Sequence, residues 1–250
     1  MVIVRFLVGL IRLLLFAITT FTLFCWFLFT NIFYENSRKL HRGLVYRRFI
    51  IRILHGIVGA KVIVYGNELG NKGLVISNHR SYFDSIVLLK NMLAYPIAKK
   101  EVASWPLVGA VAKASGVLFV NRNSKSSRKQ ILLEITEIFK RGYTVLNTPE
   151  GTTHNKPTTI PFKPGAFVIA AQLGIPVVPV AIDYKDLNDA WIGNDTFFPH
   201  FIRCFGKWQT EIKISYLDPI LSENADELIA KSKEQIDREL IRFRNEWNAA

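Results

Sequence analysis

The chain has 250 residues, half of them hydrophobic, and a formal net charge of +12 at pH 7. This length suits one sizeable α/β domain with an appendage. The two cysteines, Cys25 and Cys204, lie in distant segments, which argues against a disulfide framework. No Cys/His cluster with metal-ligand spacing and no nucleic-acid-binding motif is visible, so we expect no bound metal and no nucleic-acid partner.

The first segment is strongly apolar. Residues 13–30 read LLLFAITTFTLFCWFLFT, with no charge, glycine or proline, and the run Val2 to Leu10 extends it. Eighteen such residues reach the length of a membrane helix. A cleaved signal peptide is the alternative, but the run is long and no small-residue cleavage site follows it. We expect a membrane-embedded helix.

Basic residues are concentrated beside this segment. The first 60 residues hold eight basic side chains against the single acid Glu35, a net +7 of the chain's +12. Most of them follow the apolar run, so the positive-inside rule places the remainder of the chain on the cytoplasmic side of the inner membrane. Anionic lipid headgroups would attract the same cluster.

A second helix is predicted over residues 37–58, because apolar residues recur there at helical spacing on a basic background. Such an amphipathic face either lies in the membrane interface or packs against the following domain. We therefore divide the chain into a membrane-anchoring helical segment, residues 1–58, and a domain, residues 59–250.

Beyond residue 58, short β-rich runs alternate with helical stretches. We predict strands at 61–65, 74–77, 95–98, 117–120, 144–147, 177–182 and 211–217, and helices near 84–92, 105–115, 125–141 and 166–173. A last helix should begin after Asn224, which with Glu227 forms a capping box. The alternation predicts an α/β fold, with a mixed central sheet flanked by helices.

His79 and Asp84 follow the predicted strand 74–77 and lie five residues apart. A continuous helix would place them about 140° apart around its axis, so the pair can meet only across a break. Ser81 and Asp84 together have the pattern of a helix start, which puts His79 in a loop and Asp84 in the first turn. A carboxylate held there can orient the imidazole and leave its other nitrogen free to take a proton. Taken alone, the motif is more often an ordinary capping box beside a solvated histidine.

Three further polar stretches follow predicted strands or begin a helix. Arg122 ends the run GVLFVNR, residues 148–153 read TPEGTT, and Lys163 precedes Pro164-Gly165 at a helix start. Each alone is ordinary loop or turn chemistry. Open α/β sheets, however, bind ligands at the carboxyl ends of their strands.

The order of these motifs resembles the glycerolipid acyltransferase family, whose best-known members are the 1-acylglycerol-3-phosphate (lysophosphatidate) acyltransferases. The resemblance covers about residues 60–183 and includes the segment from Ala98 to Gly109. It implies that His79 is the catalytic base and Asp84 its partner. It also implies that the substrate is bound by Lys100, Arg122, Glu150, Gly151 and Thr152.

The resemblance implies acyl transfer from acyl-CoA or acyl carrier protein to a lysophospholipid, with membrane lipids as partners and no further cofactor. The chain departs from the family at Thr148 and Thr153, where an aromatic residue and an arginine or serine are common. With Thr153 in place of an arginine, an acceptor phosphate would have one charged partner fewer. Two kinds of acceptor therefore remain: lysophosphatidate, which we favour, and another lyso-lipid such as a lyso-aminolipid.

Two other functions remain possible for this sequence. One is a catalytically silent lipid-binding protein, which the intact His79–Asp84 pair disfavours. The other is a lipid hydrolase, which the lack of a serine or cysteine nucleophile elbow disfavours. For the same reason we expect direct transfer rather than a covalent acyl-enzyme, with backbone N–H groups around Gly151 as candidates for the oxyanion site.

Overall fold

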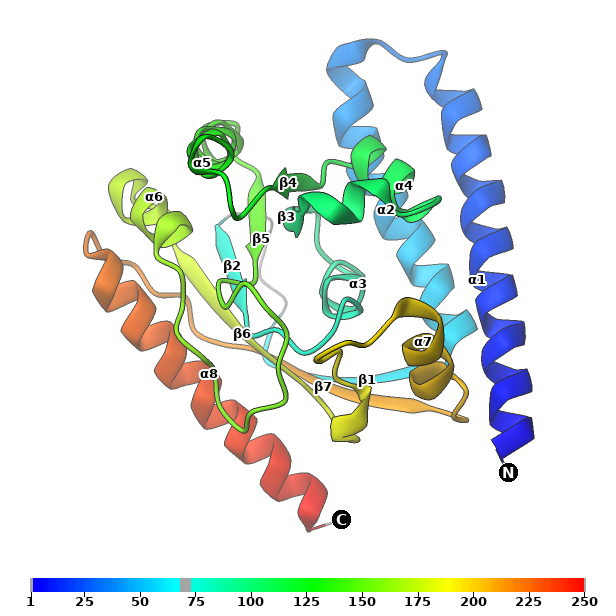
Figure 1. The fold of residues 1–250 in the computed structure, drawn as a ribbon. Coiled ribbons are helices and arrows are strands. Elements are labelled where there is room, and N and C mark those ends of the chain that lie inside the picture. The colour runs from blue at the N-terminus through cyan, green and yellow to red at the C-terminus, as the bar shows by residue number, and fades with distance from the viewer. Residues whose placement is uncertain (1, 68–72, 250) are drawn as a thin grey trace.

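The computed structural model describes residues 2–67 and 73–249, which fold around one central sheet with helices on both faces (Figure 1). Seven strands lie in the order β1-β7-β6-β2-β5-β3-β4. Their bounds are β1 Ala60–Tyr65, β2 Leu74–Ser77, β3 Ala94–Lys99, β4 Leu118–Val120, β5 Thr144–Asn147, β6 Val177–Tyr184 and β7 Thr210–Tyr216.

The sheet is mixed, as predicted. From β6 through β2, β5 and β3 to β4 all neighbours are parallel, whereas β7 pairs antiparallel with β6 and parallel with β1. The carboxyl ends of the five parallel strands therefore meet at one edge of the sheet. The loops that carry the sequence motifs all leave from this edge.

Helices cover the two faces of the sheet. They are α1 Val2–Asn31, α2 Asn36–Val58, α3 Asp84–Leu88, α4 Val108–Ala114, α5 Lys125–Lys140, α6 Gly165–Leu173, α7 Phe197–Phe205 and α8 Ala225–Asn248, with short 3₁₀ helices η1 Lys100–Ser104 and η2 Leu187–Asp189. One hydrophobic core joins α2, α3 and α7 to the sheet, and a second joins α5, α6 and α8 to its opposite face. Consecutive residues of one strand, such as Val75 and Ile76, enter different cores because successive side chains point to opposite faces of a sheet.

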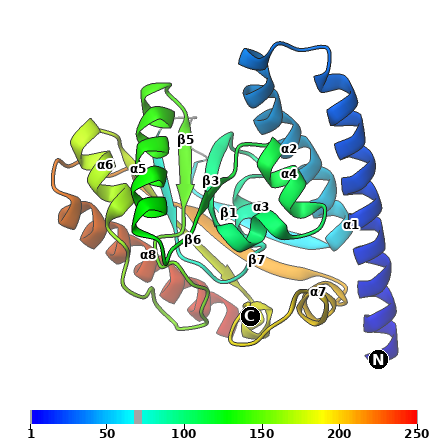
Figure 2. The same ribbon diagram turned by 45° about the horizontal axis from the view of Figure 1, so that its top comes forward.

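The first two helices form an antiparallel pair beside the sheet, and α1 runs alongside both α2 and α7 (Figures 1 and 2). The Arg12 guanidinium donates to the backbone carbonyls of Phe205 (2.9 Å), the last residue of α7, and of Trp208 (3.0 Å), just beyond it. Gly9 and Gly206 let the backbones approach closely, since a Cβ on Gly206 would lie 2.4 Å from the carbonyl oxygen of Arg5. Helix α1 is thus docked on the domain along part of its length.

The predicted strands and helices are present, with small shifts at their ends. Helix α3 is shorter than the predicted 84–92 and ends at Leu88. Helix α7 was not predicted, although its apolar residues Phe197, Phe201 and Phe205 recur every four positions. Pro199 interrupts that pattern, but it lies in the first turn, where a helix tolerates proline.

Candidate active site

Strand β2 leads directly into the His79 loop, and α3 begins at Asp84, as the sequence predicted. The Nδ1 atom of His79 lies 2.8 Å from Oδ2 of Asp84. The same oxygen accepts from the backbone N–H groups of Arg80 (2.6 Å) and Ser81 (2.9 Å). Asp84 therefore acts as an ionised acceptor, Nδ1 of His79 carries the proton, and Nε2 is left as the basic nitrogen.

The carboxylate of Asp84, rather than the hydroxyl of Ser81, shapes this loop. Asp84 bonds back to the Ser81 N–H, which is half of the predicted capping box. The other half is absent, because the Ser81 hydroxyl accepts from the Phe83 N–H (3.4 Å) instead of capping the helix. The loop conformation is consequently fixed by the group that orients the imidazole.

Glu150 holds the histidine loop from the other side. Its buried carboxylate accepts from the His79 backbone N–H (2.6 Å), the Ile160 N–H (3.0 Å) and Nε2 of His154 (2.8 Å). Nδ1 of His154 accepts from Arg80 and from the Lys156 N–H, each at 3.1 Å, so the proton of this imidazole is on Nε2. Glu150 is fully engaged by the protein and joins the 148–153 turn to the His79 loop.

Four cationic side chains lie at the edge of the site: Lys99, Arg122, Arg128 and Lys163. The Arg122 guanidinium donates to the Gly151 carbonyl, Arg128 donates to the Arg122 carbonyl, and the Lys163 ammonium lies beside Gly151. Partial burial and then the positive charges of Arg122, Lys99 and Arg128 lower the pKa of Lys163. Among the described residues, none of the four has a carboxylate within ion-pair distance. The cluster therefore favours an anionic ligand.

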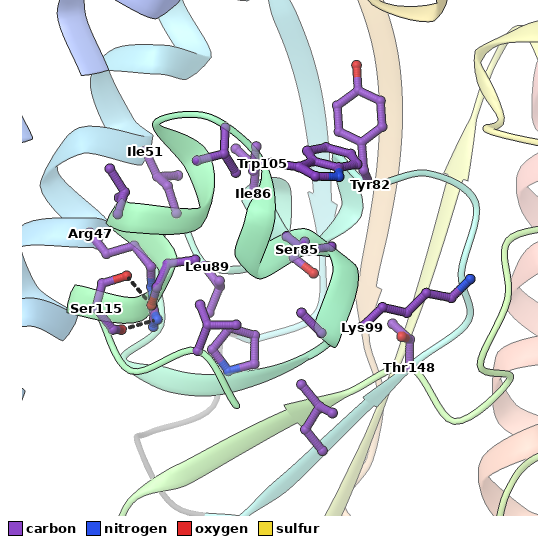
Figure 3. A pocket seen from close by; sticks show the side chains of 18 of the residues that line it. Arg47, Ile51, Tyr82, Ser85, Ile86, Leu89, Lys99, Trp105, Ser115 and Thr148 are labelled. Carbon is purple, nitrogen blue, oxygen red and sulfur yellow. Dashed lines mark hydrogen bonds between the residues drawn. The ribbon is translucent and has the colours of Figure 1, made fainter. Parts of the chain in front are cut away.

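An apolar pocket of about 420 Å³ opens beside His79. His79, Arg122, Thr148, Thr152 and Thr153 line one part of it, and the rest is lined mainly by apolar side chains of α1, α2, α3 and α4. In Figure 3, Lys99 and Thr148 lie at one end and Arg47 and Ser115 at the other, with Leu89 between. Arg47 closes that far end by donating to the carbonyls of Ser115 and Ala94. The volume is typical of a small-molecule site.

The structure brings together most of the residues that the sequence singled out. His79, Arg122 and Thr152 line the pocket with Lys99, whereas Lys100 begins η1 and is exposed. Glu150 and Gly151 stand behind the lining, Glu150 as a support of the His79 loop and Gly151 as an acceptor for Arg122. The N–H of Gly151 donates to the Thr148 carbonyl (3.1 Å), so it is already used within the turn.

The sequence analysis missed the contribution of β6. The Asn78 side chain bonds both the N–H and the carbonyl of Ile182 (2.9 Å each), Arg80 pairs with Asp183 (3.2 Å), and the Tyr184 hydroxyl donates to Asp84 (2.8 Å). Asp183 and Tyr184 stand at the end of a buried strand, the same position that drew attention to Arg122. That signal was present in the sequence but was not used.

Comparison with known proteins agrees with this geometry. A family model described as Acyltransferase matches residues 59–183. The chain is 33% identical over 171 residues to the lyso-ornithine lipid O-acyltransferase of Pseudomonas aeruginosa, covering 66% of each protein. It is also 33% identical over 146 residues to the 1-acyl-sn-glycerol-3-phosphate acyltransferase of Neisseria meningitidis, covering 56% of each.

A solved structure, the 1-acyl-sn-glycerophosphate acyltransferase of Thermotoga maritima, has the same fold, with a TM-score of 0.74 at 20% identity over 98% of both chains. The sequence matches span only about 51–66% of the lengths of the bacterial relatives. The family model nevertheless covers half of this chain, including every motif on which the resemblance was based. The chain belongs to the acyltransferase family.

Proposed function

We propose that this protein transfers a fatty acyl chain from an acyl thioester to the free hydroxyl of a lysophospholipid. One observation carries the proposal. A histidine oriented by a buried carboxylate lines an apolar pocket large enough for a lipid chain, and its second nitrogen makes no hydrogen bond to any described residue. The sequence relatives named as acyltransferases of lyso-lipids support the same reaction.

In this mechanism His79 acts as the general base. The acceptor hydroxyl attacks the thioester carbonyl carbon while Nε2 of His79 removes its proton. When the C–S bond breaks, the imidazolium returns that proton to the leaving thiolate, and an ester and a free thiol result. Asp84 stabilises the imidazolium and fixes its tautomer, and general base catalysis of this kind contributes about 10²- to 10⁴-fold.

The pocket and the 148–153 turn supply the other requirements of the reaction. The acyl chain occupies the apolar part of the pocket between α2, α3 and α4. The negative charge that develops on the carbonyl oxygen needs N–H donors. Gly151 is engaged within its turn, so the backbones of Thr152 and Thr153, which line the pocket, are the better candidates.

For the acceptor we favour 1-acylglycerol-3-phosphate, which gives phosphatidic acid. Its phosphate carries up to two negative charges and suits the cluster of Lys99, Arg122, Arg128 and Lys163, which has no acidic partner within ion-pair distance in the described structure. Arg122 is the half-buried member. Burial lowers its pKa and the more distant charge of Glu101 offsets this only in part, so a phosphate would supply a closer opposite charge.

A lyso-ornithine lipid is the second candidate. Two relatives named for that acceptor are 33% and 30% identical to the chain. Thr153 lines the pocket at a position where a cation would have strengthened phosphate binding. A threonine hydroxyl does not replace a bidentate guanidinium, so the affinity for a phosphate depends more heavily on Arg122.

The protein works at a membrane in this proposal. Helix α1 is long and apolar enough to cross a bilayer, with a mean hydropathy of 2.4 over 18 residues. The basic residues that follow it support a location of the catalytic domain at the cytoplasmic face of the inner membrane. There, the pocket lined by α1 and α2 lies close to the source of its lipid substrate.

The reaction is tested with purified protein in detergent, given labelled acyl-CoA and a panel of lyso-lipids. We expect transfer to a lysophospholipid, and a loss of about 10²- to 10⁴-fold in His79→Ala because the base is removed. His41→Ala, a histidine on α2, is the control for an unrelated imidazole. Hydrolysis of the thioester without any acceptor product would contradict the proposal, as would full transfer by His79→Ala.

The acceptor is tested by comparing kcat/KM for lysophosphatidate and for lyso-ornithine lipid in the wild type, Arg122→Ala and Lys140→Ala. Lys140, also cationic, lies at the far end of α5 and pairs with Glu137. If Arg122 binds the phosphate, its removal should lower kcat/KM for lysophosphatidate roughly 10- to 100-fold more than kcat/KM for lyso-ornithine lipid, which has no phosphate. Equal losses on both acceptors would remove Arg122 from phosphate recognition.

A further inference from the structure

Asp84 has two carboxylate oxygens, and they are held from different directions. Oδ2 accepts from His79, Arg80 and Ser81, all within its own loop. Oδ1 accepts from the Tyr184 hydroxyl at 2.8 Å, across from β6. Neither side chain is in contact with solvent, since Asp84 is 0% and Tyr184 2% exposed. No other described residue makes a hydrogen bond to Oδ1.

The strand that supplies Tyr184 is itself tied to the histidine loop. Ile182 pairs through its backbone with the Asn78 amide, and Asp183 pairs with Arg80. Three consecutive residues of β6 thus hold three residues of the loop, and Tyr184 is the member that reaches the carboxylate. Burial, followed by the charge of Asp84, raises the pKa of Tyr184 well above its ordinary value. The hydroxyl therefore remains a donor throughout the neutral pH range.

We infer that Tyr184 is a positioning residue of the proposed acyl transfer, which acts through Asp84 to hold the His79 imidazole in its reactive orientation. A carboxylate bonded only through Oδ2 could rotate about its Cβ–Cγ bond and carry the imidazole with it. The tyrosine prevents this rotation by fixing the second oxygen. It contacts neither substrate, because Tyr184 does not line the pocket.

The test rests on the proposed function and uses a double-mutant cycle in detergent, with acyl-CoA and the best acceptor of the panel. Tyr184→Phe should lower kcat by roughly 10- to 100-fold, the effect of one hydrogen bond to a charged group, and leave both KM values within about twofold. In an Asp84→Ala background, which has no oxygen to accept from the tyrosine hydroxyl, the same change should alter kcat by less than about twofold. Tyr95→Phe, which removes the hydroxyl of a tyrosine packed in the opposite core, should resemble the wild type.

Two outcomes would overturn the inference. One is wild-type kcat in Tyr184→Phe. The other is an equal loss of kcat with and without the Asp84 carboxylate, which would mean that the tyrosine acts through packing. If the wild type itself transfers no acyl chain, the proposed function fails instead, so the two failures are distinguishable.

A second measurement covers the case in which Tyr184→Phe does not fold. Replacing Tyr184 with 3-fluorotyrosine keeps the hydroxyl and the shape but makes the phenol a stronger donor. The downfield proton resonance of His79 Nδ1–H, assigned by its loss in His79→Ala, should then shift. The same replacement at Tyr95 should leave it in place. An unchanged resonance in the Tyr184 protein would contradict the inference.

Discussion

Asp84 shows how one side chain can set both the shape and the chemistry of a site. Its carboxylate makes four hydrogen bonds, two of them to backbone N–H groups of the loop that carries the base. Loop conformation and imidazole orientation are therefore coupled. A substitution at this position is expected to disturb the loop as well as the charge, so His79→Ala is the cleaner test of the base.

Buried tyrosine hydroxyls give the protein a definite response to alkaline pH. Burial raises the pKa of Tyr95 to about 12 and raises that of Tyr82 and Tyr184 as well. In the unfolded chain these groups lose their protons near pH 10. Above about pH 10 the unfolded state thus binds fewer protons than the folded state, and the free energy of unfolding falls as pH rises.

We expect the thermal unfolding midpoint to drop between pH 10 and 12, with a shallower decrease in Tyr95→Phe, which has one such hydroxyl fewer. Scanning calorimetry or fluorimetry at stepped pH measures the midpoint, and phenolate absorbance follows ionisation. Tyr95 should ionise near pH 12 in the folded protein, whereas phenolate from Tyr82 and Tyr184 should appear only with unfolding. Ionisation of Tyr82 or Tyr184 in the folded protein would contradict the burial that the structure shows.

At the scale of elements, α4 contributes a wall of the apolar pocket. Val108, Val111 and Ala112 line it, whereas Ala110, on the same helix, is exposed. The pocket ends at Arg47 and Ser115, so added volume at α4 reduces the space for an acyl chain toward that end.

Ala112→Leu should therefore shorten the acyl chain that the protein prefers. Because each buried methylene contributes about 0.8 kcal/mol, excluding two or three of them should lower kcat/KM for the longest chains by at least about tenfold, with little effect on short ones. A series of acyl-CoA lengths measures the change, with Ala110→Leu as the control. Unchanged chain-length preference in Ala112→Leu would mean that the acyl chain does not bind there.

Much of this architecture was predictable from sequence, because strand and helix periodicities in residues 60–183 are regular. The His79–Asp84 pair was predictable for a related reason: the spacing requires a break, and the strand before it locates that break. The role of β6 was harder to foresee. The sequence does not say which strand lies next to β2, and that neighbour determines that Tyr184 reaches Asp84.

At the scale of the whole molecule, α1 presents an apolar surface to its surroundings. Ile18 and Phe21 are about 60% exposed on one side, while Arg12 holds the helix to the segment after α7. A surface of this kind is stable only where another apolar phase covers it. The protein should therefore remain in the membrane fraction in high salt and leave it only in detergent, because salt screens headgroup attraction but does not weaken burial of apolar side chains.

Introducing charge into that surface should release the protein. Ile18→Glu with Phe21→Glu is expected to shift most of it to the soluble fraction, as measured by sedimentation of cell membranes. The matched control places the same two charges at Leu133 and Leu221, which are exposed apolar residues of the catalytic domain. Equal release by both double variants would show that α1 is not the attachment.

The contact between Arg12 and the segment after α7 also bears on how the molecule is made. Arg12 and the residues that it contacts are separated by more than 190 positions in the sequence. Strand β1 likewise cannot pair until β7 has been synthesised. During synthesis the first helix is completed long before the surface on which it docks exists. During that interval only α2 of its two helical neighbours, α2 and α7, has been made, and the bilayer can cover the rest of its apolar surface. The nascent chain should therefore reach the membrane before the domain has folded, and its folding should finish there.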